Sequence, residues 1–204
     1  PALIIETNFF TSTWSIVRQA AKRREVFLAI LGISWFWLVG ATYLTQFPTF
    51  AKDIIGGNEE VVVLFLTVFS VGIGVGSLLC NRLLAGEVSA QYVPLGALGM
   101  ALFSIDLVAA SQRVVVGELI GVATFLGSGA NWRLLGDLLG LAVATGVYIV
   151  PLYAIMQSWS GEENRSQVIA GNNIMNALFM VVSALVTVGL LALGFSIPGI
   201  FLAM

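Results

Sequence analysis

The sequence has no histidine, a single cysteine and few charged residues. Without histidine, the chain cannot build a Ser–His–Asp triad, a Cys–His pair or a zinc site with histidine ligands, and Cys80 alone cannot form an intramolecular disulfide. Charged residues make up 10% of the 204 residues and hydrophobic residues 58%, whereas soluble domains carry about 25% charged residues. A soluble globular domain is therefore excluded.

Five long stretches of the chain carry no charge at all. They cover residues 26–51, 61–81, 88–105, 138–161 and 166–204. Because about 20 apolar residues cross the hydrocarbon core of a bilayer, we predict an all-α, polytopic membrane protein. The predicted spans are residues 26–47, 61–84, 92–110, 134–157 and 167–193, with a sixth beginning near Ser196.

The last apolar segment, residues 199–204, is too short to be a complete span. At about 1.5 Å per residue it cannot cross a bilayer of about 30 Å. Since the sequence also begins at Pro1 rather than at a methionine, we expect a piece of a longer protein whose last helix is truncated.

Residues 1–25 form a predicted cytoplasmic linker that precedes the transmembrane bundle of residues 26–204. Its basic second half also carries Trp14 and other apolar residues, which fits either an amphipathic helix on the membrane surface or a solvated linker with a charge cluster. If the spans alternate, six basic residues fall on the side of this linker and three on the other, which places the N-terminal segment in the cytoplasm. The six are Arg18, Lys22, Arg23, Arg24, Arg82 and Arg165, and the three are Lys52, Arg113 and Arg133.

The connection over residues 112–131 contains an apolar run, residues 114–125, that is too short to cross the membrane. Glu118 interrupts this run, and several glycines weaken it as a helix. We expect it to be re-entrant or to lie on the outer surface. If it crossed the membrane, the direction of every later span would be reversed.

Three glycines, Gly72, Gly74 and Gly76, lie inside the second predicted span. Lipid gives helices no hydrophobic reason to associate, so small residues that allow close backbone approach are a usual means of packing. The glycines follow no strand, and no lysine is placed to meet a phosphate, so they do not form a phosphate-binding loop. We predict that they pack against another helix.

Amides and hydroxyls gather in the fifth predicted span. Spacings of 3, 4, 3 and 4 put five side chains on one helical stripe: Asn173, Asn176, Met180, Ser183 and Thr187. Such a stripe must face other helices or water, because unsatisfied amides are costly in hydrocarbon. Interhelical hydrogen bonds would account for one asparagine, whereas three close together, Asn172, Asn173 and Asn176, favour a solvated cavity that faces a substrate.

The first predicted span has Trp35, Thr42 and Gln46 on one face. Tryptophan usually anchors helices at the membrane boundary, but Trp35 lies near the middle of this span. This face suits the wall of a cavity for an amphiphilic ligand, or it serves helix packing alone.

Two aspartates lie in or near predicted spans, and ionisable residues there are functional candidates. Asp137 lies four residues after Arg133, as in an ordinary ion pair at a helix end, and also aligns with Thr145 and Tyr148. Proton coupling or headgroup binding by Asp106 and Asp137 therefore stays open. A membrane aspartyl protease is disfavoured, because Leu134 stands where its glycine-x-glycine-aspartate setting needs the first glycine.

The loop after the second span, residues 76–86, resembles the second copy of the major facilitator loop motif, glycine-x-leucine-x-aspartate-arginine-x-glycine. Gly76, Leu78 and Arg82 match that pattern, whereas Asn81 replaces the aspartate and Leu84 the final glycine. Residues 32–48, 162–167 and 170–180 are similar to the lysophospholipid transporter branch of that superfamily, including forms fused to a glycerophospholipid acyltransferase.

This resemblance implies the C-terminal six-helix half of a major facilitator fold, which would move lysophospholipids across the bacterial inner membrane by alternating access against a missing N-terminal half. The substrate cavity would be lined by Trp35, Thr42, Gln46, Asn172, Asn173 and Asn176. Arg82 would belong to the inner gate, and Asp106 and Asp137 to gating or coupling. We expect no enzymatic activity, cofactor, metal or nucleic acid.

Two other functions remain open from the sequence. One is a major facilitator exporter of small amphiphilic molecules. The other is a passive membrane scaffold for a fused acyltransferase, whose histidine–aspartate chemistry would reside elsewhere because this chain has no histidine.

Overall fold

The computed structural model describes residues 23–112 and 117–204, and this part of the chain is all-α. Five helices are long and apolar enough to cross a membrane, as the hydropathy predicts. These are α2 (Arg24–Thr49), α3 (Glu59–Leu84), α4 (Val93–Ser111), α6 (Gly129–Ser158) and α7 (Arg165–Ala192). Two short helices, α5 (Val122–Gly127) and α8 (Ile197–Ala203), complete the described chain. The amphipathic helix predicted within residues 1–25 falls mainly on residues 1–22, outside the described ranges.

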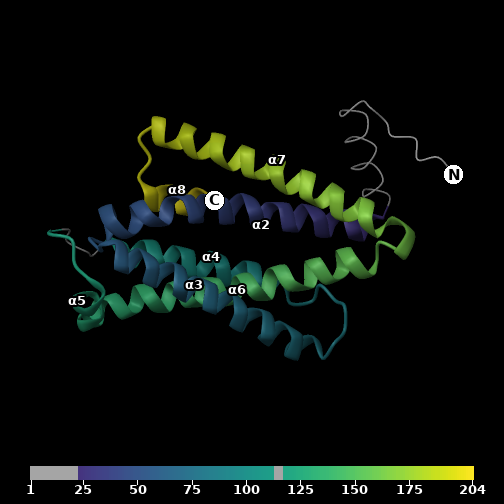
Figure 1. The fold of residues 1–204 in the computed structure, drawn as a ribbon, viewed down its shortest axis with the longest axis horizontal. Helices are drawn as coiled ribbons and strands as arrows, with labels where there is room; N and C mark the ends of the chain where they lie inside the picture. Colours follow the sequence, from purple (N-terminus) through teal and green to yellow (C-terminus); the bar gives the residue numbers. More distant parts are fainter. Residues whose placement is uncertain (1–22, 113–116) are drawn as a thin grey trace.

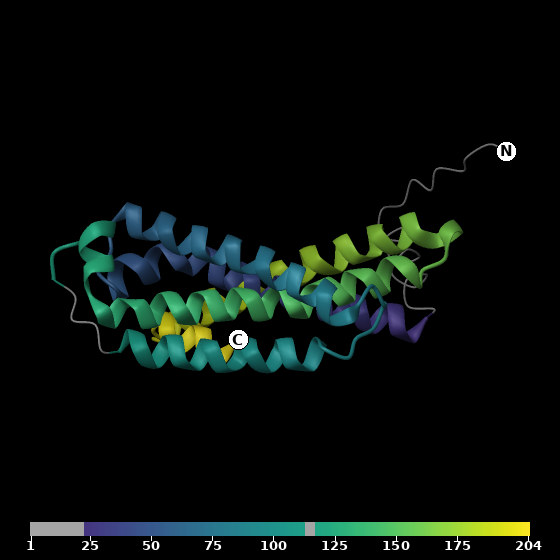
Figure 2. The same ribbon diagram turned by 90° about the horizontal axis from the view of Figure 1, so that it is seen from below.

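The five long helices run side by side along the long axis of the molecule and alternate in direction (Figures 1 and 2). Helix α6 is central, since α2, α3 and α4 all pack against it. Helix α7 lies on the far side of α2 (Figure 1) and has α2 as its main neighbour. The bundle therefore consists of a packed group around α6 and an outer helix held mainly by α2.

Local sequence signals explain how several helices begin and end. The Asn58 side chain accepts a hydrogen bond from the backbone N–H of Glu60 (2.9 Å) and so caps the start of α3. Helix α3 ends at Leu84, and the next residue, Ala85, caps it with a left-handed backbone (φ 50°) and is followed by Gly86. Pro48 does not end the first span. Helix α2 continues to Thr49 and then into a π-helical turn, Phe50–Ile54.

The connection that contains α5 does not cross the bundle. Helix α4 ends and α6 begins at the same end of the molecule, where α5 also lies (Figure 2). Two backbone hydrogen bonds join this connection to the α2–α3 loop, from Asn58 N to Ile120 O (2.9 Å) and from Ile120 N to Gly56 O (2.8 Å). The Phe125 ring is buried against Phe65. Residues 117–128 thus cap one end, and the alternation of the later helices is preserved.

The predicted packing role of the glycines in α3 is confirmed for two of the three. A Cβ atom on Gly72 would lie 3.1 Å from the carbonyl oxygen of Leu139, and one on Gly76 would collide with the carbonyl oxygen of Val143. Gly146 on α6 reciprocates, because its Cβ would lie 2.6 Å from the carbonyl oxygen of Ile73. Gly74 has open space around it. Helices α3 and α6 therefore touch through their backbones.

Candidate functional site: the seam between α2 and α7

Polar side chains are concentrated where α2 packs against α7. Six of them are buried, although both helices are strongly apolar. We call this set the α2–α7 seam: Ser34 and Thr42 on α2, and Asn172, Asn176, Ser183 and Thr187 on α7. Three of these residues, Asn176, Ser183 and Thr187, belong to the polar stripe that the sequence predicts for this helix.

Two hydrogen bonds cross the seam. The Ser34 hydroxyl donates to Asn176 Oδ1 at 2.9 Å, and the hydroxyls of Thr42 and Ser183 lie 2.7 Å apart. The Thr42 hydroxyl is also 3.2 Å from the carbonyl oxygen of Leu38 in its own helix. These contacts are interhelical hydrogen bonds of the kind that polar groups form between membrane helices. Asn176 and Thr42 are therefore engaged within the bundle.

Two other seam atoms have no hydrogen-bond partner. They are Asn172 Oδ1 and Thr187 Oγ1, and both are inaccessible to solvent. Burying such an atom without a partner costs about 1–3 kcal/mol. The two atoms lie in α7 on either side of the two hydrogen-bonded pairs, so the unsatisfied polarity falls at the ends of the seam.

A groove of about 390 Å³ opens along the seam beyond the Thr42–Ser183 contact. Its polar lining comes from Thr45, Gln46, Ser183 and Thr187, and its apolar lining includes Met180 and Val188. This groove combines an amide and hydroxyls with an apolar wall. It can therefore hold a group that is polar on one side and apolar on the other.

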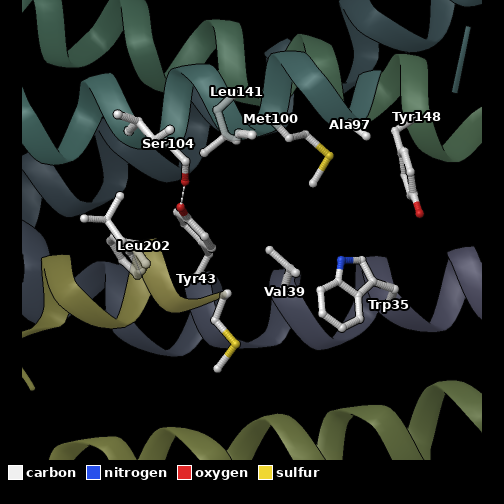
Figure 3. A pocket seen from close by; sticks show the side chains of 13 residues that line it. Trp35, Val39, Tyr43, Ala97, Met100, Ser104, Leu141, Tyr148 and Leu202 are labelled. Atoms are coloured by element: carbon white, nitrogen blue, oxygen red, sulfur yellow. Dashed lines mark hydrogen bonds between the residues drawn. The ribbon is translucent and has the colours of Figure 1, made fainter. Parts of the chain in front are cut away.

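A second groove, of about 310 Å³, lies between α2 and α4 near the end of α8 (Figure 3). Trp35, Val39 and Tyr43 line it from α2, and Met100 and Ser104 from α4. The hydroxyls of Tyr43 and Ser104 are hydrogen-bonded across its end. The lining is mainly apolar and aromatic, which suits hydrocarbon rather than a charged group.

The structure brings together only part of the predicted cavity lining. Trp35 is 49% exposed and faces the α2–α4 groove, whereas Gln46 lines the α2–α7 groove on the neighbouring side of the same helix. Asn173 is exposed, and Asn172 takes the place in the seam that the spacing gives to Asn173. Ser34 was not among the predicted residues, and nothing in the sequence marks its pairing with Asn176.

The charged candidates lie away from the seam. Arg133 forms its ion pair with Asp106 on α4, with Nε 3.0 Å from Oδ2, instead of with Asp137 in its own helix. Asp137 is 5% exposed, and its Oδ2 has no hydrogen-bond partner. Arg82 is exposed in the last turn of α3. Within residues 23–112 and 117–204, no three His, Cys, Asp or Glu side chains are grouped to hold a metal ion.

A comparison with models of protein families, with curated proteins and with solved structures finds no match to this chain. The functional argument therefore starts from the seam and its two flanking grooves.

Proposed function

We propose that the chain is one helical half of a secondary transporter that moves lysophospholipids across a membrane by alternating access. In this proposal the half is the C-terminal one of a major facilitator fold, and it works against a second six-helix half. The membrane is the bacterial inner membrane, with the N-terminal segment in the cytoplasm. Arg82 belongs to the inner gate, and Asp106 and Asp137 take part in coupling.

The observation that carries the proposal is the pair of grooves on either side of α2. One has Gln46, Thr45 and Thr187 in its lining, and the other has Trp35 and Tyr43. A lysophospholipid has a polar headgroup and a single acyl chain, so it needs a polar and an apolar surface side by side. Helix α2 supplies both surfaces on neighbouring faces.

The loose attachment of α7 also supports the proposal. Only 17% of the most apolar window of this span is buried within the described chain, against 22% for α3 and for α4 and 67% for α6. A helix with so little buried surface can shift against its neighbours at a lower cost than a central one. Alternating access needs such a movable wall next to the substrate.

The test is uptake of lysophosphatidylethanolamine into proteoliposomes that contain the protein with both transporter halves. Gln46→Leu and Thr45→Val remove accessible polar groups from the α2–α7 groove, and loss of a hydrogen bond worth about 1.4 kcal/mol lowers uptake about tenfold. Thr67→Val is the matched control, because the Thr67 hydroxyl is exposed and bonds only to Val63 O in its own helix (2.7 Å). Uptake in Thr67→Val should equal that of the wild type.

The same assay separates the other functions. Wild-type protein that folds and inserts but gives no uptake would favour a passive scaffold. Uptake that unrelated amphiphiles abolish at equal concentration would favour an exporter of small amphiphilic molecules. Uptake that is unchanged in both groove variants would refute the site while leaving transport intact.

A further inference from the structure

One buried carboxyl group lies outside the α2–α7 seam and outside the two grooves beside α2. Asp137 is the ninth residue of α6, about 12 Å along the helix from its start near α5. The residue is 5% exposed, and no N–H or hydroxyl group of the described chain donates a hydrogen bond to its Oδ2. An ionised carboxylate that is buried without such donors is strongly disfavoured. Asp137 therefore needs a compensating partner.

Two charged side chains lie next to Asp137. A side-chain hydrogen bond joins it to Asp106 on α4, and Arg133 lies one turn earlier on its own helix. The Arg133 guanidinium gives its hydrogen bonds to Asp106, with Nε 3.0 Å from Oδ2. We call these three side chains the Asp106–Arg133–Asp137 cluster. With both carboxyl groups ionised, the cluster has one positive and two negative charges, so one negative charge is not compensated.

The helices packed around α6 bring no other charge to the cluster. Helix α3 has no charged residue over residues 61–81, α2 has none over residues 26–51, and Asp106 is the one charged residue of α4. Tyr43, which faces α4 from α2, has its hydroxyl bonded to Ser104. Within the described chain, the charges that act on Asp137 are therefore those of Asp106 and Arg133.

The other acidic side chains near α5 are at the surface. Glu59, Glu60 and Glu118 are all exposed. Glu59 forms an ion pair with Lys52 at 2.6 Å, and Glu60 Oε2 accepts a hydrogen bond from the backbone N–H of Val122 at 3.2 Å. These carboxylates are solvated or paired, so they do not share the environment of Asp137.

A proton satisfies the cluster, whereas a metal ion does not. One proton between the two carboxyl groups supplies the donor that they lack and brings the net charge of the cluster to zero. Two carboxyl groups held this close cannot both ionise and so share a proton. A divalent cation needs about six oxygen ligands, and within residues 23–112 and 117–204 no three acidic, Cys or His side chains are grouped. Arg133 would also repel such a cation.

The cluster is accessible from the end of the bundle that carries α5. The side chains of Asp106 and Arg133 are 44% and 41% exposed, and Asp137 lies one helical turn deeper than Arg133. Arg133 is about 6 Å from the start of α6. Trp132 beside it is 58% exposed, which is typical of the membrane–water boundary. A proton from that surface reaches Asp137 through Asp106.

We propose that Asp106 and Asp137 bind one exchangeable proton between them. In the protonated form, the Asp137 carboxyl donates a hydrogen bond to Asp106, which also accepts from Arg133. When the proton leaves toward the α5 end, the uncompensated charge of Asp137 attracts the Arg133 guanidinium, which is then divided between the two carboxylates. The binding of this proton does not depend on transport, whereas its coupling to lysophospholipid movement rests on the proposed function.

Proton counting on the full protein in detergent tests the site. Because the chain has no histidine, none of its side chains ordinarily titrates between about pH 5 and 8. Over this range the wild type should bind one proton more than Asp137→Asn, measured as the acid needed to lower the pH. Asp53→Asn is the matched control, because Asp53 is exposed outside the cluster and its removal should leave the count unchanged.

Asp106→Asn tests whether the proton is shared. Without the Asp106 carboxylate, Arg133 can pair with Asp137 four residues later on the same helix, so Asp137 no longer needs a proton. The count should fall by one proton, as it does in Asp137→Asn. A count in Asp106→Asn equal to that of the wild type would assign the proton to Asp137 alone and would overturn the shared site.

Infrared spectroscopy of the wild type needs no variant to fold. In a detergent without ester or carboxyl groups, the spectrum should contain the C=O band of a protonated carboxyl group at about pH 5, and this band should disappear by about pH 8. Absence of the band, or equal proton counts in the wild type and Asp137→Asn, would overturn the proposal. Neither measurement uses a lysophospholipid, so failure of this site is distinguished from failure of the transport proposal.

Discussion

Two helix–helix contacts of the described bundle, α3 with α6 and α2 with α7, are built from different chemistry. Helices α3 and α6 meet through Gly72, Gly76 and Gly146, where one backbone lies directly against the other. Helices α2 and α7 meet through hydroxyl and amide side chains, with the Ser34–Asn176 hydrogen bond at 2.9 Å. The first contact has no room for an added methyl group, whereas the second depends on a few directional bonds.

This difference indicates which contact is able to change. Backbone packing at glycines weakens steeply when the helices separate, so we expect α3 and α6 to stay together when the bundle changes shape. A side-chain hydrogen bond in a membrane protein contributes about 0.6 kcal/mol on average and can exchange its partner. The α2–α7 seam therefore combines weak attachment with the polar groups that a substrate would need.

The largest expected effect is at the glycine contact. Gly76→Leu should lower the free energy of unfolding by about 3 kcal/mol, because its side chain would overlap the backbone of Val143. Unfolding in mixed micelles with increasing dodecyl sulfate, followed by circular dichroism, gives the value. Gly74→Leu, two residues earlier and in open space, should be neutral, and equal losses in the two variants would contradict backbone packing at Gly76.

A smaller effect is expected at the hydrogen-bonded seam. Ser34→Ala removes the donor to Asn176 Oδ1 and leaves that buried oxygen unsatisfied, which should cost about 1.5 kcal/mol. The same unfolding titration applies. Ser77→Ala is the control, because the Ser77 hydroxyl bonds to Ile73 O within its own helix (2.8 Å). If Ser34→Ala lowers the free energy of unfolding as much as Gly76→Leu does, the contrast between the α2–α7 seam and the α3–α6 contact is wrong.

The seam should also tolerate a change that no glycine contact allows. Thr187→Val replaces a buried hydroxyl that has no partner by a methyl group of the same shape, so we expect a gain of about 1 kcal/mol in stability. Stability in micelles is to be compared with that of Thr67→Val, whose hydroxyl is exposed. A loss of stability in Thr187→Val would show that its hydroxyl does have a partner in the folded protein.

The smallest effect is expected at a hydrogen bond between α2 and α6. Trp37 Nε1 donates to the Tyr153 hydroxyl at 3.1 Å, and the pair is only partly buried. Tyr153→Phe should lower stability by about 0.5 kcal/mol, near the average for such bonds in membrane proteins. A double-mutant cycle with Trp37→Phe measures the coupling, and a value above that for Ser34 and Asn176 would reverse the ranking.

Hydropathy and glycine spacing were sufficient to predict the helices but not their neighbours. The five spans follow from charge-free runs, because the thickness of the bilayer imposes a minimum length. The close contact at Gly72 and Gly76 follows from their spacing of four. That α6 is the helix they contact does not follow, because any helix with small residues would fit such a surface.

The candidate site was only partly visible in the sequence. Polar residues spaced three and four apart predict the polar stripe of α7 to within one residue. Which of the two asparagines faces α2 depends on how the helix is rotated about its axis, and it is Asn172, not Asn173, that is buried there. The ion pair of Arg133 with Asp106 joins residues 27 positions apart, and local spacing favours Asp137 instead. The grooves beside α2 depend on how three helices diverge, which no single-helix pattern encodes.

The two hydrogen bonds between Ile120 and the α2–α3 loop have a consequence for the order of assembly. Ile120 is made more than sixty residues after Gly56, so α3 and α4 are complete before the loop meets its partner. Until then, the backbone groups of that loop depend on water at the membrane surface. We therefore expect the segment around α5 to bind to the α2–α3 loop late in assembly, after α3 and α4 have formed.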